Sequence, residues 1–265
     1  MTVKKTYVDV ADGQIHLRYV SGNGTVPTVF LHQTASSSAM YQAVMEQLAD
    51  LAPLYALDTP GFGGSYRPPV VPTTAYYVES LMQAIDALGI DQFNLFGHHT
   101  GAALACELAA KHPQRVRKLA ILGPVQLTEE ERSLWRDSAV KPLNIDAQAT
   151  HFNEVWQRVT HLDQQPIEYP PSVALATREA IDTLIAGDRW HEAYAAVFNQ
   201  DFPAYLAQVK CPLLMICGEA DVLYPYFQRA REARPDAQVL ELKAGAYVLD
   251  QEPMYMAQVI RGFFH

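Results

Sequence analysis

Chemically useful side chains gather in four loops, each of which follows an apolar run typical of a buried strand. Histidines and carboxylates are prominent among them, and a histidine, whose ordinary pKa is about 6.5, can take up a proton near pH 7. In an open parallel sheet, the loops at the carboxyl ends of the strands are where ligands bind. The four loops, which therefore predict one shared site, are Leu31-His-Gln-Thr34, Gly97-His-His-Thr-Gly101, Gly218-Glu-Ala-Asp221 and Ala244-Gly-Ala-Tyr247.

The segments between these loops alternate between strand and helix patterns. From Tyr7 to Leu31, polar and apolar residues alternate between glycine-containing turns at residues 12–13 and 21–24, which predicts a β-meander. Buried strand-like runs then alternate with apolar residues at helical spacing, up to a last helix that Pro253 opens. Strands joined by crossover helices predict a mostly parallel α/β sheet of about eight strands, with helices on both faces.

One long segment, residues 125–208, breaks this alternation. It contains helical stretches, all three tryptophans of the chain, and prolines at positions 166, 170 and 171. We interpret it as a helical cap subdomain inserted into a core domain that residues 1–124 and 209–265 form. The prolines Pro166 and Pro170-Pro171 interrupt the helical pattern and are candidates for a cap hinge.

The loop at residues 97–101 carries the most specific pattern of the chain. Gly97 and Gly101 bracket it between a predicted strand and a predicted helix, where small residues permit a sharp turn that strains its central residue. With this motif and this order of elements, nearly the whole chain resembles the α/β-hydrolase superfamily, in particular its small cap-bearing branch. That superfamily has Gly-x-Ser-x-Gly here, so the resemblance places His99 at the nucleophile position and implies an eight-stranded core with an inserted cap.

Two further loops follow the resemblance in different degrees. It implies that Asp221 is the acid of the site and that Tyr247 stands where the family has its catalytic histidine. Asp221 can also be a turn or helix-cap residue, and Tyr247 a packed aromatic residue whose hydroxyl is bound by Asp221. The family's usual His-Gly oxyanion loop reads His32-Gln33 here, and His32 is also a candidate support for that loop.

These departures restrict the chemistry. Without a serine at position 99 and a histidine at position 247, a serine-triad mechanism is excluded. The resemblance still implies an oxyanion hole of backbone N–H groups, with donors from Thr100 and from Gln33 or Thr34. His99 is then the candidate general base or nucleophile, and Asp221 and Tyr247 can orient it or stabilise its charge.

Several reactions fit such a site. His99 can activate water or attack an ester or thioester, which gives hydrolysis, or it can deprotonate a substrate, which gives lyase, decarboxylase or retro-aldol chemistry. A catalytically inactive pseudoenzyme that only binds its ligand is the alternative. The cap is rich in aromatic and aliphatic residues, which indicates a small, mainly apolar or aromatic substrate of carbonyl type, such as an ester, thioester, lactone, or β-keto or β-hydroxy compound. The candidate substrate-binding residues are His32, Trp135, Trp156 and Tyr224.

A metal site is the remaining chemical alternative. His32, His98, His99 and Asp221 belong to loops that meet in the predicted fold. However, neighbouring residues of a sharp turn are expected to point in divergent directions, and no His-x-His or His-x-x-x-His spacing is present. We therefore expect no metal and no organic cofactor, and we expect His98 to pack beneath the turn.

Composition excludes other classes of function. The chain of 265 residues has 29 acidic and 20 basic residues and a formal net charge of −9, with no long basic cluster, so nucleic acid is not an expected partner. Its three cysteines lack metal-type spacing, and it has neither a signal-like apolar segment nor a run long enough to span a membrane. We expect a cytoplasmic protein with a small-molecule substrate and no membrane partner; a homodimer is left open.

Overall fold

The computed structural model describes residues 2–162 and 165–265. Its centre is an eight-stranded sheet in the order β1-β2-β4-β3-β5-β6-β9-β10. Only the pairings of β1 with β2 and of β2 with β4 are antiparallel, and all the others are parallel, which confirms the predicted sheet. The strands are β1 (Lys4–Val10), β2 (Gly13–Val20), β3 (Thr28–Leu31), β4 (Leu54–Leu57), β5 (Phe93–His98), β6 (Val116–Leu122), β9 (Leu213–Gly218) and β10 (Gln238–Leu242).

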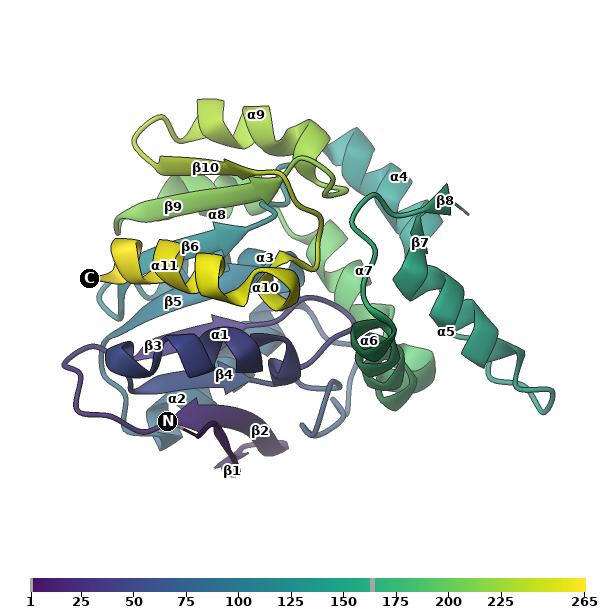
Figure 1. The fold of residues 1–265 in the computed structure, drawn as a ribbon, viewed down its shortest axis with the longest axis horizontal. Coiled ribbons are helices and arrows are strands. Elements are labelled where there is room, and N and C mark those ends of the chain that lie inside the picture. The colour runs from purple at the N-terminus through teal and green to yellow at the C-terminus, as the bar shows by residue number, and fades with distance from the viewer. Residues whose placement is uncertain (1, 163–164) are drawn as a thin grey trace.

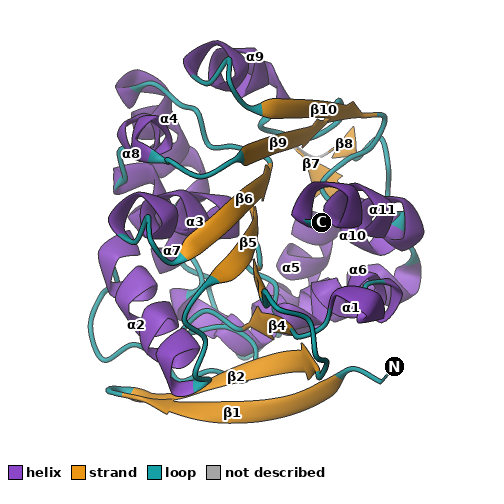
Figure 2. Cartoon of the chain, turned by 90° about the vertical axis from the view of Figure 1, so that its left-hand side faces the viewer, coloured by secondary structure: helices purple, strands orange, loops and turns teal. Residues whose placement is uncertain are grey.

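Helices cover both faces of this sheet because its strands are apolar on both sides. Successive side chains of a strand point to opposite faces. In β3, Val29 and Leu31 accordingly belong to one buried apolar cluster and Phe30 to another. The first cluster lies under α2 (Thr74–Ala87) and α3 (Thr100–Lys111), and the second under α1 (Gln42–Gln47), α10 (Val248–Gln251) and α11 (Pro253–Phe264) (Figure 2). Helix α9 (Tyr224–Ala233) connects β9 to β10.

The apolar residues Met40, Val44, Leu48 and Leu51 lie at helical spacing and predict a helix after β3, but the α-helix in the structure is shorter than this spacing indicates. A 3-10 turn at Ser38–Tyr41 precedes α1, and a second one at Ala49–Leu51 follows it. Pro53 accounts for the end of the second turn at Leu51, because a proline disfavours helical backbone in the residue before it, here Ala52.

Within residues 125–162 and 165–208, no strand belongs to the eight-stranded sheet. These residues contain α4 (Glu129–Ala139), α5 (Thr150–Thr160), α6 (Val173–Ala186), α7 (Glu192–Asn199) and α8 (Phe202–Gln208), with a two-stranded sheet of β7 (His161–Leu162) and β8 (Gln165–Pro166). Figure 1 shows α4, α5 and α6 beside the edge of the sheet toward which the parallel strands point. Helix α8 instead packs on α3. The division into core and cap at residues 125 and 208, and the proline hinge, stay predictions.

No helix among residues 2–162 and 165–265 combines the length and the apolar character that crossing a membrane requires.

Candidate active site

The turn between β5 and α3 holds His99 in a strained backbone conformation. Its φ of 48° and ψ of −108° lie in a region that a residue with a Cβ rarely adopts. The flanking glycines are sterically required, because a Cβ on Gly97 would overlap the Gly101 carbonyl oxygen and a Cβ on Gly101 would overlap that of Leu31. The strand–turn–helix geometry that was predicted from the glycine spacing is therefore present, with His99 at its tip.

His99 is paired directly with Asp221. Its Nε2 lies 2.7 and 2.9 Å from the two oxygens of that carboxylate, and the two side chains are 15% and 1% exposed. The Leu223 backbone N–H donates to the same carboxylate at 2.8 Å, which fixes its orientation. When Nε2 carries the proton that Asp221 accepts, the lone pair of a neutral ring is on Nδ1. Within the described residues, this Nδ1 has no hydrogen-bond partner.

Gly123, directly after β6, makes room for the His99 ring. A Cβ at this position would overlap ring carbon Cδ2 of His99, and the residue has a φ of +66°. Gly123 was not among the residues predicted for the site. The signal that could have found it is a glycine at the carboxyl end of a third buried strand beside the predicted site.

His98 packs beneath the turn, and its ring lies against that of His99 rather than pointing away from it. The ring centroids are 4.3 Å apart, which corrects the expectation that neighbouring residues of the turn diverge. The reason is local: the strained backbone of His99 folds its ring back toward β6 and Gly123. His98 is fully buried, and neither ring nitrogen has a partner among the described residues. Burial lowers the pKa of His98 well below its usual range, so the ring is neutral.

His98, His99 and Asp221 also form a set of potential metal ligands, because their donor atoms all lie within 4.8 Å of one another. Two imidazoles and a carboxylate suit zinc and similar ions. Two ligands about 2.0 Å from a tetrahedral ion, however, stand roughly 3.3 Å apart. The 2.7 Å contact of His99 with Asp221 has instead the length of a hydrogen bond. The geometry as it stands fits proton transfer better than metal ligation.

Tyr247 does not contact the pair, although it lines the same cavity. Its hydroxyl donates at 3.0 Å to the carbonyl of Val159 on α5. The predicted orienting role, and the alternative of a hydroxyl bound by Asp221, are both corrected by this contact. A phenol hydroxyl extends further from the backbone than an imidazole nitrogen, so it reaches the cap. Burial raises the pKa of Tyr247, which therefore stays neutral.

The loop after β3 lies against the start of α3. The Thr34 and Thr100 hydroxyl oxygens are 2.8 Å apart, and Gln33 and Thr34 line the cavity, whereas the Thr100 side chain does not. The backbone N–H groups of Gln33 and Thr100 have no hydrogen-bond partner in the part of the chain that the structure describes. The beginning of a helix favours negative charge, so an anion can bind here.

Of the four predicted substrate-binding residues, only Trp135 lines this cavity. His32 is buried: its Nε2 accepts from the Thr59 N–H at 3.0 Å and its Nδ1 donates to the Gln33 carbonyl at 2.7 Å, so it supports the loop. Tyr224 donates to Glu241 at 2.7 Å, away from the site, because α9 turns it outward. Trp156 packs on the apolar cluster instead.

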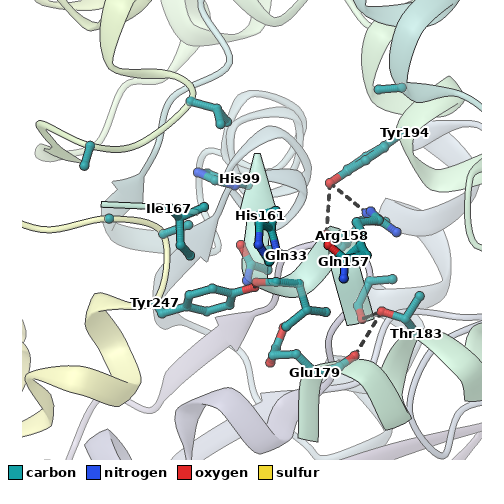
Figure 3. A pocket seen from close by; sticks show the side chains of 18 of the residues that line it. Gln33, His99, Gln157, Arg158, His161, Ile167, Glu179, Thr183, Tyr194 and Tyr247 are labelled. Atoms are coloured by element: carbon teal, nitrogen blue, oxygen red, sulfur yellow. Dashed lines mark hydrogen bonds between the residues drawn. The ribbon is translucent and has the colours of Figure 1, made fainter. Parts of the chain in front are cut away.

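The cavity that contains these groups has a volume of about 780 Å³. Figure 3 shows His99 and Tyr247 in its wall together with side chains from α5, α6 and α7. One part of the wall is apolar, as expected, and includes Trp135, Val159, Ile167 and Val222. The polar part includes the predicted His99, Gln33 and Thr34 and, in addition, six residues that were not predicted: Gln157, Arg158, His161, Glu179, Thr183 and Tyr194.

Comparisons with known proteins give a consistent result. Residues 26–253 match the family model described as alpha/beta hydrolase fold. A proline iminopeptidase from Heyndrickxia coagulans is 27% identical over an alignment of 248 positions that covers 83% of this chain and 83% of the relative. An uncharacterized carboxylesterase from Bacillus subtilis is 24% identical over an alignment of 277 positions, gaps included, that covers 99% of this chain and 87% of the relative. The match to an abhydrolase domain-containing protein from Caenorhabditis elegans, 30% identical over 131 residues, covers 48% of this chain but only 30% of that protein.

Solved structures agree on the fold. A hydrolase from Pseudomonas aeruginosa superposes with a TM-score of 0.82 at 19% identity, covering 98% of both chains. An enol-lactonase from Burkholderia xenovorans superposes with a TM-score of 0.78 at 18% identity, covering 98% of this chain and 99% of the other.

Proposed function

The chain belongs to the alpha/beta hydrolase fold family, and we propose that it is an enzyme of this family that uses His99 in place of a serine nucleophile. Its substrate is a small carbonyl compound such as an ester, thioester or lactone. Relatives named as a carboxylesterase and a haloalkane dehalogenase, and a structural neighbour named as an enol-lactonase, support hydrolytic chemistry.

The observation that carries the proposal is the direct contact between His99 and Asp221. The carboxylate holds the Nε2 proton and stabilises the positive charge that the ring gains when it takes up a second proton. Nδ1 is then the base. A base that is fixed by the backbone at a turn and oriented by a buried carboxylate is aligned before the substrate arrives.

In the hydrolytic route, Nδ1 of His99 removes a proton from a water molecule as the water oxygen attacks the substrate carbonyl carbon. The carbonyl oxygen becomes an oxyanion, and the Gln33 and Thr100 backbone N–H groups are its proposed donors. The tetrahedral intermediate then expels the leaving oxygen or sulfur, which takes the proton back from Nδ1. Direct attack by Nδ1, giving an acyl-imidazole that water hydrolyses, uses the same groups. Lyase or decarboxylase chemistry remains the second candidate, because the same base and donors also stabilise an enolate.

A panel of small esters, thioesters and lactones, assayed by release of acid, tests the proposal. His99→Ala should lower kcat about 10²- to 10⁴-fold while substrate binding changes less than about tenfold, because a base acts mainly in the transition state. Asp221→Asn should cost less, since it orients the base without making or breaking a bond. His112→Ala, which removes a histidine outside the cavity, is the matched control.

Two outcomes would contradict the proposal. One is full activity in His99→Ala. The other is a set of tight ligands that wild-type protein returns chemically unchanged after long incubation, which would favour the pseudoenzyme.

A further inference from the structure

Arg158 of α5 brings a positive charge to the wall of the cavity. Its guanidinium carbon lies 3.5 Å from the centre of the Trp190 ring and 5.5 Å from that of Tyr194. Because the face of the guanidinium is stacked on Trp190, any hydrogen bonds to a ligand come from its edge, which carries the N–H groups.

This charge lacks an acidic counterpart among the described residues. No carboxylate of theirs lies within ion-pair distance of Arg158, and its Nη1 is buried without a hydrogen-bond partner. The guanidinium has five N–H donors. The one hydrogen bond that it makes within residues 2–162 and 165–265 is from Nη2 to the Tyr194 hydroxyl oxygen, at 3.3 Å. A partly enclosed cation of this kind is stabilised when an anion enters beside it.

The acid on the same wall does not serve as that anion. Glu179 accepts from Arg178 at 2.5 Å and from the Ser36 hydroxyl at 2.9 Å. Burial also raises the pKa of the Glu179 carboxyl. Glu179 is therefore paired with Arg178 and does not neutralise Arg158.

Two hydrogen bonds connect Arg158 to the loop after β3. The Tyr194 hydroxyl, which accepts from Arg158, donates to the carbonyl of Thr34 at 3.1 Å, and Thr34 contacts Thr100 beside His99. Figure 3 shows Arg158 next to Tyr194 and apart from His99. The cation thus has a fixed place in the cavity, separate from the proposed base.

We propose that Arg158 binds a carboxylate of the substrate, so that the enzyme acts on small carbonyl compounds that also carry a free acid group. This inference rests on the proposed function of His99. The two oxygens of a carboxylate match the guanidinium edge, as two oxygens of a phosphate also do. However, Arg158 is the single arginine or lysine among the described cavity residues, which suits one negative charge better than two. The remaining apolar wall contacts the hydrocarbon part of such a substrate.

Matched esters test this assignment: the monomethyl esters of butanedioate, pentanedioate and hexanedioate against the corresponding dimethyl esters. Binding is measured by calorimetry at pH 7 in the His99→Ala background, where turnover does not interfere. The best half-ester should bind about 10- to 100-fold more tightly than its dimethyl ester. Arg158→Gln should remove this preference while changing dimethyl ester binding less than about threefold. Arg136→Gln on α4, which removes the same charge outside the cavity, should retain it.

The results separate this inference from the proposed function. Half-ester preference without any turnover in wild-type protein would reject the proposed function and keep the carboxylate subsite. Turnover of both ester types at equal kcat/KM, with no loss in Arg158→Gln, would reject the subsite and keep the base. If Arg158→Gln does not fold, the His99→Ala protein alone decides. The subsite is rejected if this protein binds the half-ester and the dimethyl ester equally tightly and if its affinity for the half-ester does not fall with added salt.

Discussion

The position of the His99 ring depends on Gly123. We predict that Gly123→Ala destabilises the protein by about 2–5 kcal/mol, because it adds a residue with a Cβ at a positive φ and forces that Cβ into the ring. Activity should fall with it, since the displaced ring loses its contact with Asp221. Urea unfolding and ester turnover measure the two effects.

The His99→Ala background separates the two causes. With the ring gone, Gly123→Ala should cost only the backbone strain, about 1–2 kcal/mol. An equal cost in both backgrounds would show that Gly123 does not shape the site.

The nearness of His98, His99 and Asp221 calls for a direct test of metal dependence. We predict that dialysis against EDTA leaves turnover unchanged, and that added zinc inhibits or has no effect, because the base mechanism needs the His99–Asp221 hydrogen bond. Elemental analysis of the purified protein accompanies the assay. Zinc bound at one ion per chain, lost together with activity in both His98→Ala and His99→Ala, would assign the pair to a metal centre instead.

Single residues show how far the sequence predicts this site. The glycine spacing around His99 predicts the strained turn because both glycines lie within five residues and one of the close approaches, that of Gly97 to the Gly101 carbonyl, is local; the other, of Gly101 to Leu31, joins the turn to β3. Asp221 follows from its place after a buried strand. The partner of Tyr247 and the role of Arg158 depend on where α5 lies over the sheet, and no local pattern specifies that contact.

Among the elements, α6 is joined to the loop after β3 by two hydrogen bonds between buried groups. The Ser36 hydroxyl donates to Glu179 at 2.9 Å, and the Ser37 hydroxyl donates to Asp182 at 2.8 Å. Burial, with a contribution from neighbouring Glu179, raises the pKa of Asp182 to about 6. The contact between Ser37 and Asp182 holds α6 next to the loop that carries Gln33. The protonation of Asp182 therefore affects how stable the packing of α6 on this loop is.

The sign of this effect follows from linkage. The unfolded Asp182 ionises near pH 3.8 and the folded one near pH 6, so the folded state holds more protons in between and stability falls as pH rises through that window. Asp182→Asn keeps an acceptor for Ser37 but cannot ionise. We predict that its free energy of unfolding, relative to wild type, rises by about 2.4 kcal/mol between pH 4 and pH 7. Urea unfolding at both pH values measures this, with exposed Asp137→Asn as control. A difference that does not vary with pH would contradict it.

The elements themselves were predicted better than their limits. Nearly continuous apolar runs identify β3 and β5 because both faces of these strands are buried under apolar clusters. The helix after β3 was predicted too long, since apolar spacing continues through its 3-10 turns and does not distinguish them from an α-helix.

In the whole molecule, one apolar cluster runs from the sheet into the predicted cap. Val155, Val159 and Trp190 from residues 125–208 belong to the same buried cluster as Leu57 and Leu104 from the core. Separating the two parts would expose apolar surface on both, at roughly 25 cal/mol per Å². The cap is therefore not expected to unfold by itself, and a substrate must enter through a local opening.

The positions of the tryptophans and cysteines make this testable. All three tryptophans lie within residues 125–208, so their fluorescence reports on that segment, whereas Cys106 is buried in α3. Burial raises the pKa of the Cys106 thiol, so alkylation requires the core to open. We predict that tryptophan fluorescence and Cys106 alkylation, followed by peptide mass spectrometry, give the same urea midpoint, because one cluster stabilises both parts. A fluorescence transition that is complete while Cys106 is still protected would show that the cap opens as a unit, and would place substrate entry at the junction of α6 with the loop after β3.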